Sequence, residues 1–239
     1  MTATSLEISD LTAGYGPTRI IENLSLSVAP GARLAVLGRN GMGKTTLLAT
    51  LAGQTRRYAG TIRLGNTELT NLSGSARALA GLGYVPQQRA IFKSLSVEEN
   101  LLVGIKNRNA AAIEEAFAMF PRLKERRRNL GTQLSGGEQQ MLTTARTLLG
   151  QPSVLLLDEP LEGLAPVICD ELMEVFGEVA KSRSMTILLV EQRLQAALAF
   201  AEQVIVLERG RISWTGTPRQ LSEDPETIGK VLGVSHNSG

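Results

Sequence analysis

The chain has 239 residues, 43% of them hydrophobic and 20% charged, and its formal net charge at pH 7 is +2. This length suits one large domain with a substantial core, and the near-neutral charge does not favour electrostatic binding of nucleic acid. The apolar runs are too short for a membrane span, the start MTATSLEISD does not resemble a signal peptide, and one cysteine excludes an internal disulfide, so we expect a cytoplasmic protein.

The N-terminal part of the chain is predicted to contain strands and one helix. Residues 6–28 place apolar side chains two apart between turn residues, which predicts antiparallel strands. LAVLG at 34–38 predicts a buried strand, and KTTLLATLAG beyond it predicts a helix that ends at Gly53. A short strand pair is expected over 60–69, and the strand in GLGYVPQ stops at Pro86.

From about 88 to 150 the composition is helical, and we expect a helical subdomain inserted into an α/β domain that spans 1–239. The elements expected there are a helix capped by Ser96 with Glu99, a helix over 110–120 and a helix from Gly137 to Leu149. The basic run RLKERRR (122–128) is interpreted as a solvated helix face, with a patch for phosphate or a partner protein as the alternative.

Strands and helices alternate again after Gly150. The expected elements are buried strands in VLLLD and TILLVE around a helix at 166–180, a helix at 193–201, strands in VIVLE and RISWTG, and a helix begun by Thr217 and Pro218. The pattern therefore predicts an α/β fold with a mostly parallel sheet, an antiparallel β subdomain and the α-helical insertion.

A glycine-rich loop lies between the strand at 34–38 and the helix after it. GRNGMGKT fits the phosphate-binding pattern G-x-x-x-x-G-K-[ST], in which glycines let backbone N–H groups converge on an anion at a helix N-terminus. Lys44 would supply charge to the β- and γ-phosphates of ATP, and Thr45 would offer its hydroxyl to Mg²⁺. The alternative is a glycine-rich turn with a surface lysine. The predicted nucleotide-binding residues of this P-loop are Gly38, Arg39, Asn40, Gly41, Met42, Gly43, Lys44, Thr45 and Thr46.

Two acids follow the buried strand VLLLD. Ligands bind at the carboxyl ends of strands in open parallel sheets, which is where Asp158 and Glu159 fall. We predict that Asp158 holds Mg²⁺ through water and that Glu159 polarises the attacking water. The one histidine, His236, is in the C-terminal tail, so no histidine in the body of the chain is available for chemistry. These features predict a P-loop ATPase core.

LSGGEQQ places Ser135, Gly136, Gly137 and Glu138 at the start of a helix, a second anion-binding arrangement that lacks a lysine. One nucleotide does not need two such sites, so the second is interpreted as serving a nucleotide held by another subunit. With this motif the chain resembles the ATPase subunit of an ABC transporter over essentially its whole length. The resemblance implies a head-to-tail dimer in which ATP lies between the P-loop of one subunit and the signature motif of the other.

The resemblance also implies roles for three residues outside these motifs. Tyr15 in TAGYG would stack on adenine, although by itself it fits a turn tyrosine equally well. Gln87 in YVPQ would sense Mg²⁺ and contact the membrane partner. Gln192 stands where the wider family has a histidine; it can donate a hydrogen bond to the γ-phosphate but cannot carry a proton. The implied catalytic residues are Glu159 and Gln192, and the implied metal ligands are Thr45, Gln87 and Asp158.

The segment after Glu159 departs from the wider family, since Glu162-Gly163-Leu164-Ala165 stands where Ser-Ala-Leu-Asp is common. An acid near the dimer interface and its triphosphates should be repelled unless it is paired, and we favour a side chain that points to solvent. Cys169, early in the next helix, is interpreted as a buried apolar residue in preference to a redox or metal-binding one.

VPQQRAIFKSLSVEENL, LSGGEQQML, GLAP and LLVEQ together resemble the branched-chain amino acid uptake group, and the urea uptake ATPases are similar. The resemblance implies an importer with a second ATPase subunit, identical or different, two integral membrane permease subunits and, indirectly, a substrate-binding protein. It places the chain peripherally on the cytoplasmic face of the inner membrane, with ATP and Mg²⁺ as cofactors and no nucleic acid partner. The alternatives are an exporter ATPase, a soluble ABC-type ATPase that acts on nucleic acid or ribosomes, or a protein that binds ATP without hydrolysing it.

Overall fold

The computed structural model describes residues 4–105 and 112–232. A six-stranded sheet forms its centre, in the order β10–β9–β3–β8–β7–β6. All neighbours in this sheet are parallel except β9 and β10, so the predicted mostly parallel sheet is confirmed. Its strands are β3 (Arg33–Leu37), β6 (Leu82–Val85), β7 (Val154–Asp158), β8 (Thr186–Val190), β9 (Gln203–Glu208) and β10 (Arg211–Gly216).

The parallel strands of the central sheet are buried on both faces, because one hydrophobic core packs on one face and two pack on the other. Successive side chains of a strand point to opposite faces. Leu156 of β7 therefore packs in the core around α1 (Lys44–Leu51), and Leu155 and Leu157 pack in the core of α6 (Gly136–Leu149) and α7 (Pro166–Ser182). Cys169 is buried in this second core, as expected. The unbroken apolar runs VLLL and ILLV are therefore the consequence of a sheet covered on both sides.

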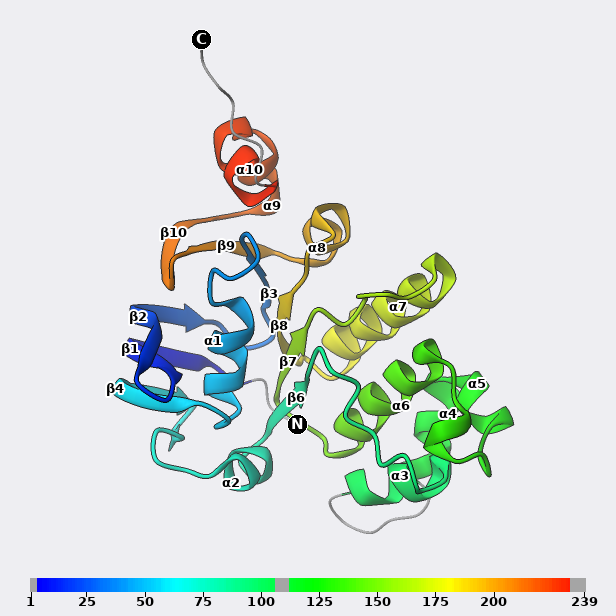
Figure 1. Cartoon of the computed structure of the whole chain (residues 1–239). Coiled ribbons are helices and arrows are strands. Elements are labelled where there is room, and N and C mark those ends of the chain that lie inside the picture. The colour runs from blue at the N-terminus through cyan, green and yellow to red at the C-terminus, as the bar shows by residue number, and fades with distance from the viewer. Residues whose placement is uncertain (1–3, 106–111, 233–239) are drawn as a thin grey trace.

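The second sheet is antiparallel, with the order β2–β1–β4–β5, and it covers α1 on the side away from the central sheet (Figure 1). Both the predicted strands at 6–28 and the predicted strand pair at 60–69 lie in it, although β4 begins earlier than expected. Gly60 (φ 86°) lies within β4, where a Cβ would be 2.5 Å from the carbonyl oxygen of Ser9. The strands are β1 (Leu6–Tyr15), β2 (Thr18–Val28), β4 (Arg56–Leu64) and β5 (Thr67–Glu68).

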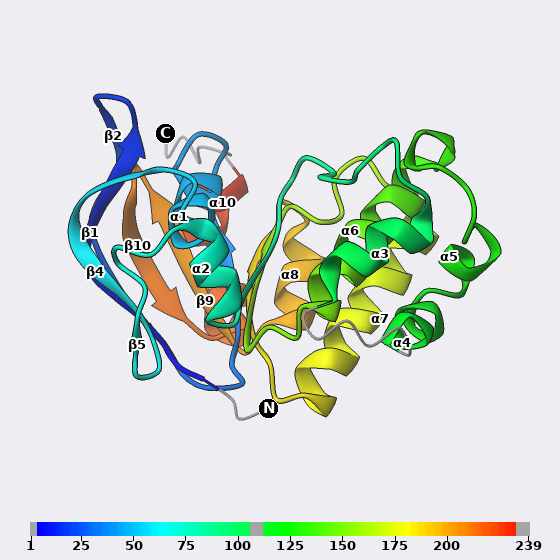
Figure 2. The same cartoon turned by 90° about the horizontal axis from the view of Figure 1, so that it is seen from below.

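The helices between β6 and β7, here called the helical lobe, lie on the side of the central sheet opposite the antiparallel sheet (Figure 2). The predicted capping box of Ser96 and Glu99 is present, and Ser135 caps the next long helix one residue earlier than expected. Residue 110, the expected start of a helix, lies outside the described residues. The lobe contains α3 (Val97–Gly104), α4 (Ala112–Met119), α5 (Pro121–Glu125), the 3₁₀ turn η1 (Gly131–Gln133) and α6 (Gly136–Leu149).

The basic run at 122–128 lies along α5 and the turn after it. Its side chains form salt bridges with acids of neighbouring helices, among them Arg122 with Glu171 at 3.0 Å and Lys124 with Glu114 at 3.2 Å. Arg126 and Arg127 pair in the same way with acids at the starts of α6 and α3. This neutralisation agrees with a solvated helix face and leaves little unpaired charge for a phosphate.

The remaining helices connect the strands of the central sheet and close the C-terminal end. They are α2 (Gly74–Leu79), α7 (Pro166–Ser182), α8 (Leu194–Phe200), α9 (Pro218–Ser222) and α10 (Pro225–Leu232). Thr217 caps α9 with Gln220, as the Thr-Pro pair predicts. His236 lies outside the described residues. Across the described ranges, every helix is too short or too polar to cross a membrane.

Candidate nucleotide-binding site

The P-loop connects β3 to α1, and its backbone requires glycine. Gly38 has a φ of 143°, and a Cβ there would be 2.4 Å from the carbonyl oxygen of Leu207 in β9. Gly43 has a φ of 101° and is the N-terminal cap of α1. Gly41 also has a left-handed backbone conformation, with a φ of 80°, but a Cβ there would meet no atom within 4 Å. The loop therefore turns with its backbone exposed at the N-terminus of a helix, where N–H groups and the helix dipole favour an anion.

Lys44 lies within this loop and is only 4% exposed. Its Nζ donates to the carbonyl oxygens of Gly38 at 2.8 Å and Arg39 at 3.0 Å. Burial lowers the pKa of Lys44, while the charges of Glu159 and Asp158 act in the opposite direction. A surface lysine is therefore the wrong interpretation, because the ammonium group is held at the centre of the loop with nearby acids.

Asp158 is completely buried at the end of β7 and accepts two hydrogen bonds. Thr45 Oγ1 donates to Oδ1 at 3.0 Å, and the Tyr84 hydroxyl donates to Oδ2 at 3.1 Å. Burial raises the pKa of Asp158, and these two hydrogen bonds oppose that shift. Burial and the neighbouring carboxylate also raise the pKa of Tyr84. Tyr84 was not predicted as a site residue; the available signal was its place near the end of the strand in GLGYVPQ.

The oxygens around Asp158 suit Mg²⁺, which prefers hard oxygen ligands and is usually held by one or two side chains together with phosphate oxygens and water. The Thr45 hydroxyl and the Asp158 carboxylate already lie within 3.0 Å of each other. Among the residues described, no group of three or more histidine, cysteine or acidic side chains is arranged to hold a metal ion. The donors present thus fit Mg²⁺ bound with a nucleotide.

Glu159 follows Asp158 in a strained backbone conformation, with a φ of 47°. Non-glycine residues in this region are uncommon and cluster at functional sites, where the surrounding structure holds them. The Glu159 N–H donates to the carbonyl of Val190 in β8 at 2.9 Å. Its Oε2 accepts hydrogen bonds from Nε2 of Gln192 at 2.5 Å and, more distantly, from Nε2 of Gln87 at 3.5 Å. Three segments far apart in the sequence therefore converge on one carboxylate.

Glu191, which was not predicted, supports the residue that follows it. It is 3% exposed, and its Oε1 accepts from the backbone N–H groups of Gln192 at 2.8 Å and Arg193 at 3.0 Å. Burial raises its pKa, and its Oε2 has no hydrogen-bond partner in the described part of the chain. An acid at a strand end, as in the Asp158 pattern, was the signal that could have identified it.

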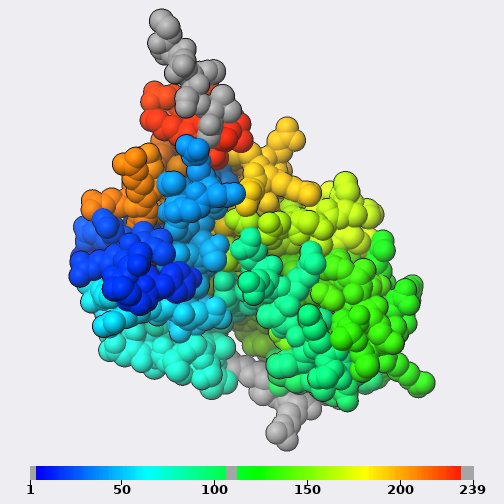
Figure 3. Space-filling model, viewed as in Figure 1, coloured from blue at the N-terminus to red at the C-terminus, as the bar shows by residue number. Residues whose placement is uncertain are grey.

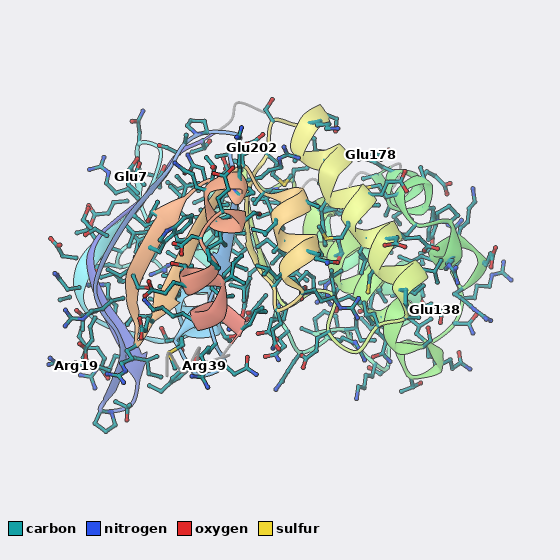
Figure 4. All side chains as sticks on the ribbon, turned by 90° about the horizontal axis from the view of Figure 1, so that it is seen from above. Glu7, Arg19, Arg39, Glu138, Glu178 and Glu202 are labelled. Carbon is teal, nitrogen blue, oxygen red and sulfur yellow. The ribbon has the colours of Figure 1, made fainter. Side chains whose placement is uncertain are left out.

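The residues of LSGGEQQ form a capped helix start on the helical lobe. Ser135 Oγ accepts from the Glu138 N–H at 3.3 Å, and Glu138 Oε2 accepts from the Ser135 N–H at 2.8 Å. Gly136 lies against the guanidinium group of Arg89. Figure 4 shows Arg39 of the P-loop and Glu138 on different lobes but toward the same side of the molecule. Within one chain, this helix start and the P-loop therefore lie apart from each other.

Tyr15 lies at the end of β1, and 48% of its surface is exposed. The ring of Tyr58, in contrast, already stacks with two guanidinium groups, those of Arg19 and Arg56, whose central carbons lie 5.4 and 5.2 Å from its centroid. The antiparallel sheet borders the P-loop, because a Cβ at Gly43 would meet the side chain of Ile21 in β2. An exposed aromatic ring on this sheet is thus available for stacking.

The family model described as "ABC transporter" matches residues 21–162 of the chain. This range runs from β2 through the P-loop and the signature motif to the turn after Glu159. The chain belongs to the ABC transporter family. As a member of this family it is an ATP-hydrolysing transport ATPase, and the predicted P-loop ATPase fold is confirmed.

Two curated relatives and one solved structure illustrate the match to the ABC transporter family. The high-affinity branched-chain amino acid transport ATP-binding protein BraG of Pseudomonas aeruginosa is 37% identical over 95% of this chain and 99% of its own length. The lipopolysaccharide export system ATP-binding protein LptB of Escherichia coli is 31% identical over 96% of this chain and 97% of its own. A dimeric ATP-binding cassette in a post-hydrolysis state, bound to ADP and Pi, shares the fold with a TM-score of 0.80 at 22% identity, covering 90% of this chain and 99% of its own.

Proposed function

We propose that this chain is the ATPase subunit of an ABC importer for branched-chain or other hydrophobic amino acids, or for a related small solute such as urea. The observation that carries the hydrolytic role is the convergence of Lys44, Asp158, Glu159 and Gln192 at the carboxyl ends of adjacent parallel strands. The similarity to BraG at 37% identity supports the substrate class. The similarity to LptB keeps an exporter as the second candidate.

In the proposed site, the P-loop holds the phosphates of ATP. The N–H groups of residues 38–46 and the Lys44 ammonium bind the β- and γ-phosphates, and Tyr15 stacks on adenine. Thr45, Asp158 and Gln87 hold Mg²⁺, which neutralises the charge that develops on the phosphates. The Lys44 ammonium is already surrounded by two backbone carbonyls, so little side-chain entropy remains to be lost when a phosphate binds.

Glu159 then orients the attacking water, and Gln192 has two tasks. Its amide can donate to the γ-phosphate, and it also holds Oε2 of Glu159 at 2.5 Å. Glu191 fixes the backbone from which Gln192 extends. Because an amide neither gains nor loses a proton near neutral pH, no group at position 192 shuttles a proton during turnover.

Ser135, Gly136, Gly137 and Glu138 are proposed to contact the nucleotide held by a second ATPase subunit. Their place on a different lobe from the P-loop, but on the same side of the molecule, fits a head-to-tail arrangement (Figure 4). In that arrangement each nucleotide is covered by the P-loop of one subunit and the signature helix of the other. Whether the two subunits are identical or different chains depends on the transporter.

A groove between the α/β core and the helical lobe offers a docking site for a membrane partner. It encloses about 570 Å³ and is lined by residues of α2, β6 and α3 and by the segment just beyond Gln87. Phe92 and Val103 are apolar lining residues that are 47% and 58% exposed. A hollow between the two lobes is visible in Figure 3. We propose that a permease subunit docks here and places the chain peripherally on the cytoplasmic face of the inner membrane.

The decisive experiment is a partner census in the native cell. Tagged Glu159→Gln protein is trapped with ATP and Mg²⁺, the membranes are solubilised gently, and the copurifying proteins are identified. Two multi-span membrane proteins together with a second ATPase of this type support the importer, and the accompanying binding protein defines the solute. Recovery with components of lipopolysaccharide export supports the second candidate. Recovery with ribosomes or nucleic acid alone contradicts both.

A further inference from the structure

Glu162 lies in the turn after Glu159, and both side chains lie within reach of the Gln87 amide nitrogen. Its side chain is exposed, as expected, but it is also paired: Oε2 accepts a hydrogen bond of 2.7 Å from Nε2 of Gln87. The turn is held by the Glu162 N–H, which donates to the carbonyl of Glu159 at 3.2 Å, and by Arg89, whose Nη2 donates to the Glu162 carbonyl at 3.4 Å. The acid is therefore exposed to solvent, as favoured, and it is paired as well.

The hydrogen bonds around Gln87 decide which end of its amide faces the acids. Nε2 is shared between Glu162 Oε2 at 2.7 Å and Glu159 Oε2 at 3.5 Å. An ionised carboxylate only accepts hydrogen bonds, so it selects the NH₂ end of the amide and turns the carbonyl oxygen away. Gln87 is itself an exposed loop residue, and no other side-chain hydrogen bond of its amide is present within the described ranges. Without Glu162, the longer contact with Glu159 alone would hold the amide weakly.

We propose that Glu162 is a positioning residue for Gln87. By accepting the hydrogen bond from Nε2, Glu162 holds the Gln87 amide in the orientation that leaves its oxygen available to Mg²⁺. The inference rests on the proposed role of Gln87 as a metal ligand. Only the oxygen end of an amide binds Mg²⁺, so an unrestrained amide would lose part of its affinity by presenting its nitrogen. The same contact accounts for an acid close to bound triphosphates, since part of its negative charge is compensated by the donors of Gln87.

The test measures metal binding directly. Mn²⁺ replaces Mg²⁺, and its affinity for the full-length protein saturated with a non-hydrolysable ATP analogue is determined by electron paramagnetic resonance. Glu162→Ala should weaken Mn²⁺ binding about five- to tenfold, the range expected when a supporting hydrogen bond to a ligand is lost. Glu162→Gln keeps an acceptor oxygen, but its amide nitrogen can also donate to the Gln87 oxygen, so it should weaken Mn²⁺ binding by less than Glu162→Ala but measurably relative to wild type. Glu178→Ala removes an exposed acid of α7, whose side chain points outward in Figure 4, and serves as the matched control.

Two further variants separate this inference from the role of Gln87. Gln87→Ala should weaken Mn²⁺ binding at least as much as Glu162→Ala, and the double variant should be no weaker than Gln87→Ala alone, because the two residues act as one unit. Analogue binding in EDTA should be the same in all variants. Glu162→Ser, whose hydroxyl is too short to reach Gln87, provides an independent second variant should the alanine protein melt at a lower temperature.

Different combinations of Mn²⁺ affinities overturn different parts of this proposal. Normal Mn²⁺ binding by Glu162→Ala together with weakened binding by Gln87→Ala overturns the inference and leaves the role of Gln87 intact. Normal binding by Gln87→Ala overturns both. Equal weakening by Glu162→Ala and Glu162→Gln shows that the charge of Glu162 acts on the metal without the hydrogen bond, and it overturns the positioning role.

Discussion

Replacing Gln192 by alanine removes the hydrogen bond of 2.5 Å that its Nε2 donates to Oε2 of Glu159. Hydrogen bonds to charged groups contribute about 1.5–3 kcal/mol, and each 1.36 kcal/mol in a barrier changes a rate about tenfold. Gln87 does not compensate, because its Nε2 is 3.5 Å from the same oxygen. If this bond holds Glu159 in place for the attacking water, phosphate release should slow by roughly 10- to 100-fold.

The assay is steady-state phosphate release at saturating ATP and Mg²⁺, with binding of a fluorescent ATP analogue measured in parallel. Binding should change little, because Gln192 would act on the reacting centre while the P-loop carries most of the affinity. Gln192→His is the matched variant. Its imidazole can still donate to Glu159, so most of the rate should return, and a pH-dependent step near the histidine pKa of about 6.5 should appear.

Two results would refute this reasoning. The first is a wild-type rate of phosphate release in Gln192→Ala. The second is a histidine-like step in the pH–rate profile of the native protein that survives removal of His236, since no other histidine exists in the chain.

Three other predictions follow from the site and its supporting residues. Glu159→Gln should keep ATP binding and lose phosphate release by at least a hundredfold, the range for loss of a positioned acid–base group; an unchanged rate would remove Glu159 from the catalytic role. Gly38→Ala should lower the free energy of unfolding by roughly 2–4 kcal/mol in urea titrations, because a Cβ would be 2.4 Å from the Leu207 carbonyl in a left-handed backbone. Gly41→Ala, with open space around it, should cost only about 1 kcal/mol, and equal losses would contradict the steric argument. Burial raises the pKa of Glu191 in the folded state, so its contribution to stability is present below the ordinary glutamate value and is lost as pH rises through the raised pKa. The stability of wild type relative to Glu191→Gln should therefore fall as pH rises above the ordinary glutamate pKa, and a difference that is flat or rises with pH would contradict this.

The strongest predictions came from motifs whose function depends on local geometry. The P-loop is a contiguous segment, so its spacing alone indicates glycines for a turned backbone and a lysine at a helix start, and the left-handed Gly43 at the cap of α1 agrees with it. The capping box at Ser96 and the helix start at Thr217 were predicted equally well, because each depends on residues at most three apart, whereas the capping box of Ser135 with Glu138 was not predicted. The short elements α2 and η1 were missed, since a few residues contain too little periodicity to recognise.

The sequence by itself determined the family and the ATPase chemistry, because these depend on short runs with characteristic spacing, and it predicted the residues that we propose hold the phosphates. Tertiary structure alone decided that Tyr84 and Thr45 share Asp158 and that Gln87 is held by Glu162. The paired residues of these contacts come from different strands or loops, as do Gln87 and Glu162, which are 75 residues apart in the chain. Parallel strands bring their carboxyl ends to one edge of the sheet wherever they lie in the sequence, and no local pattern records which side chains will meet there.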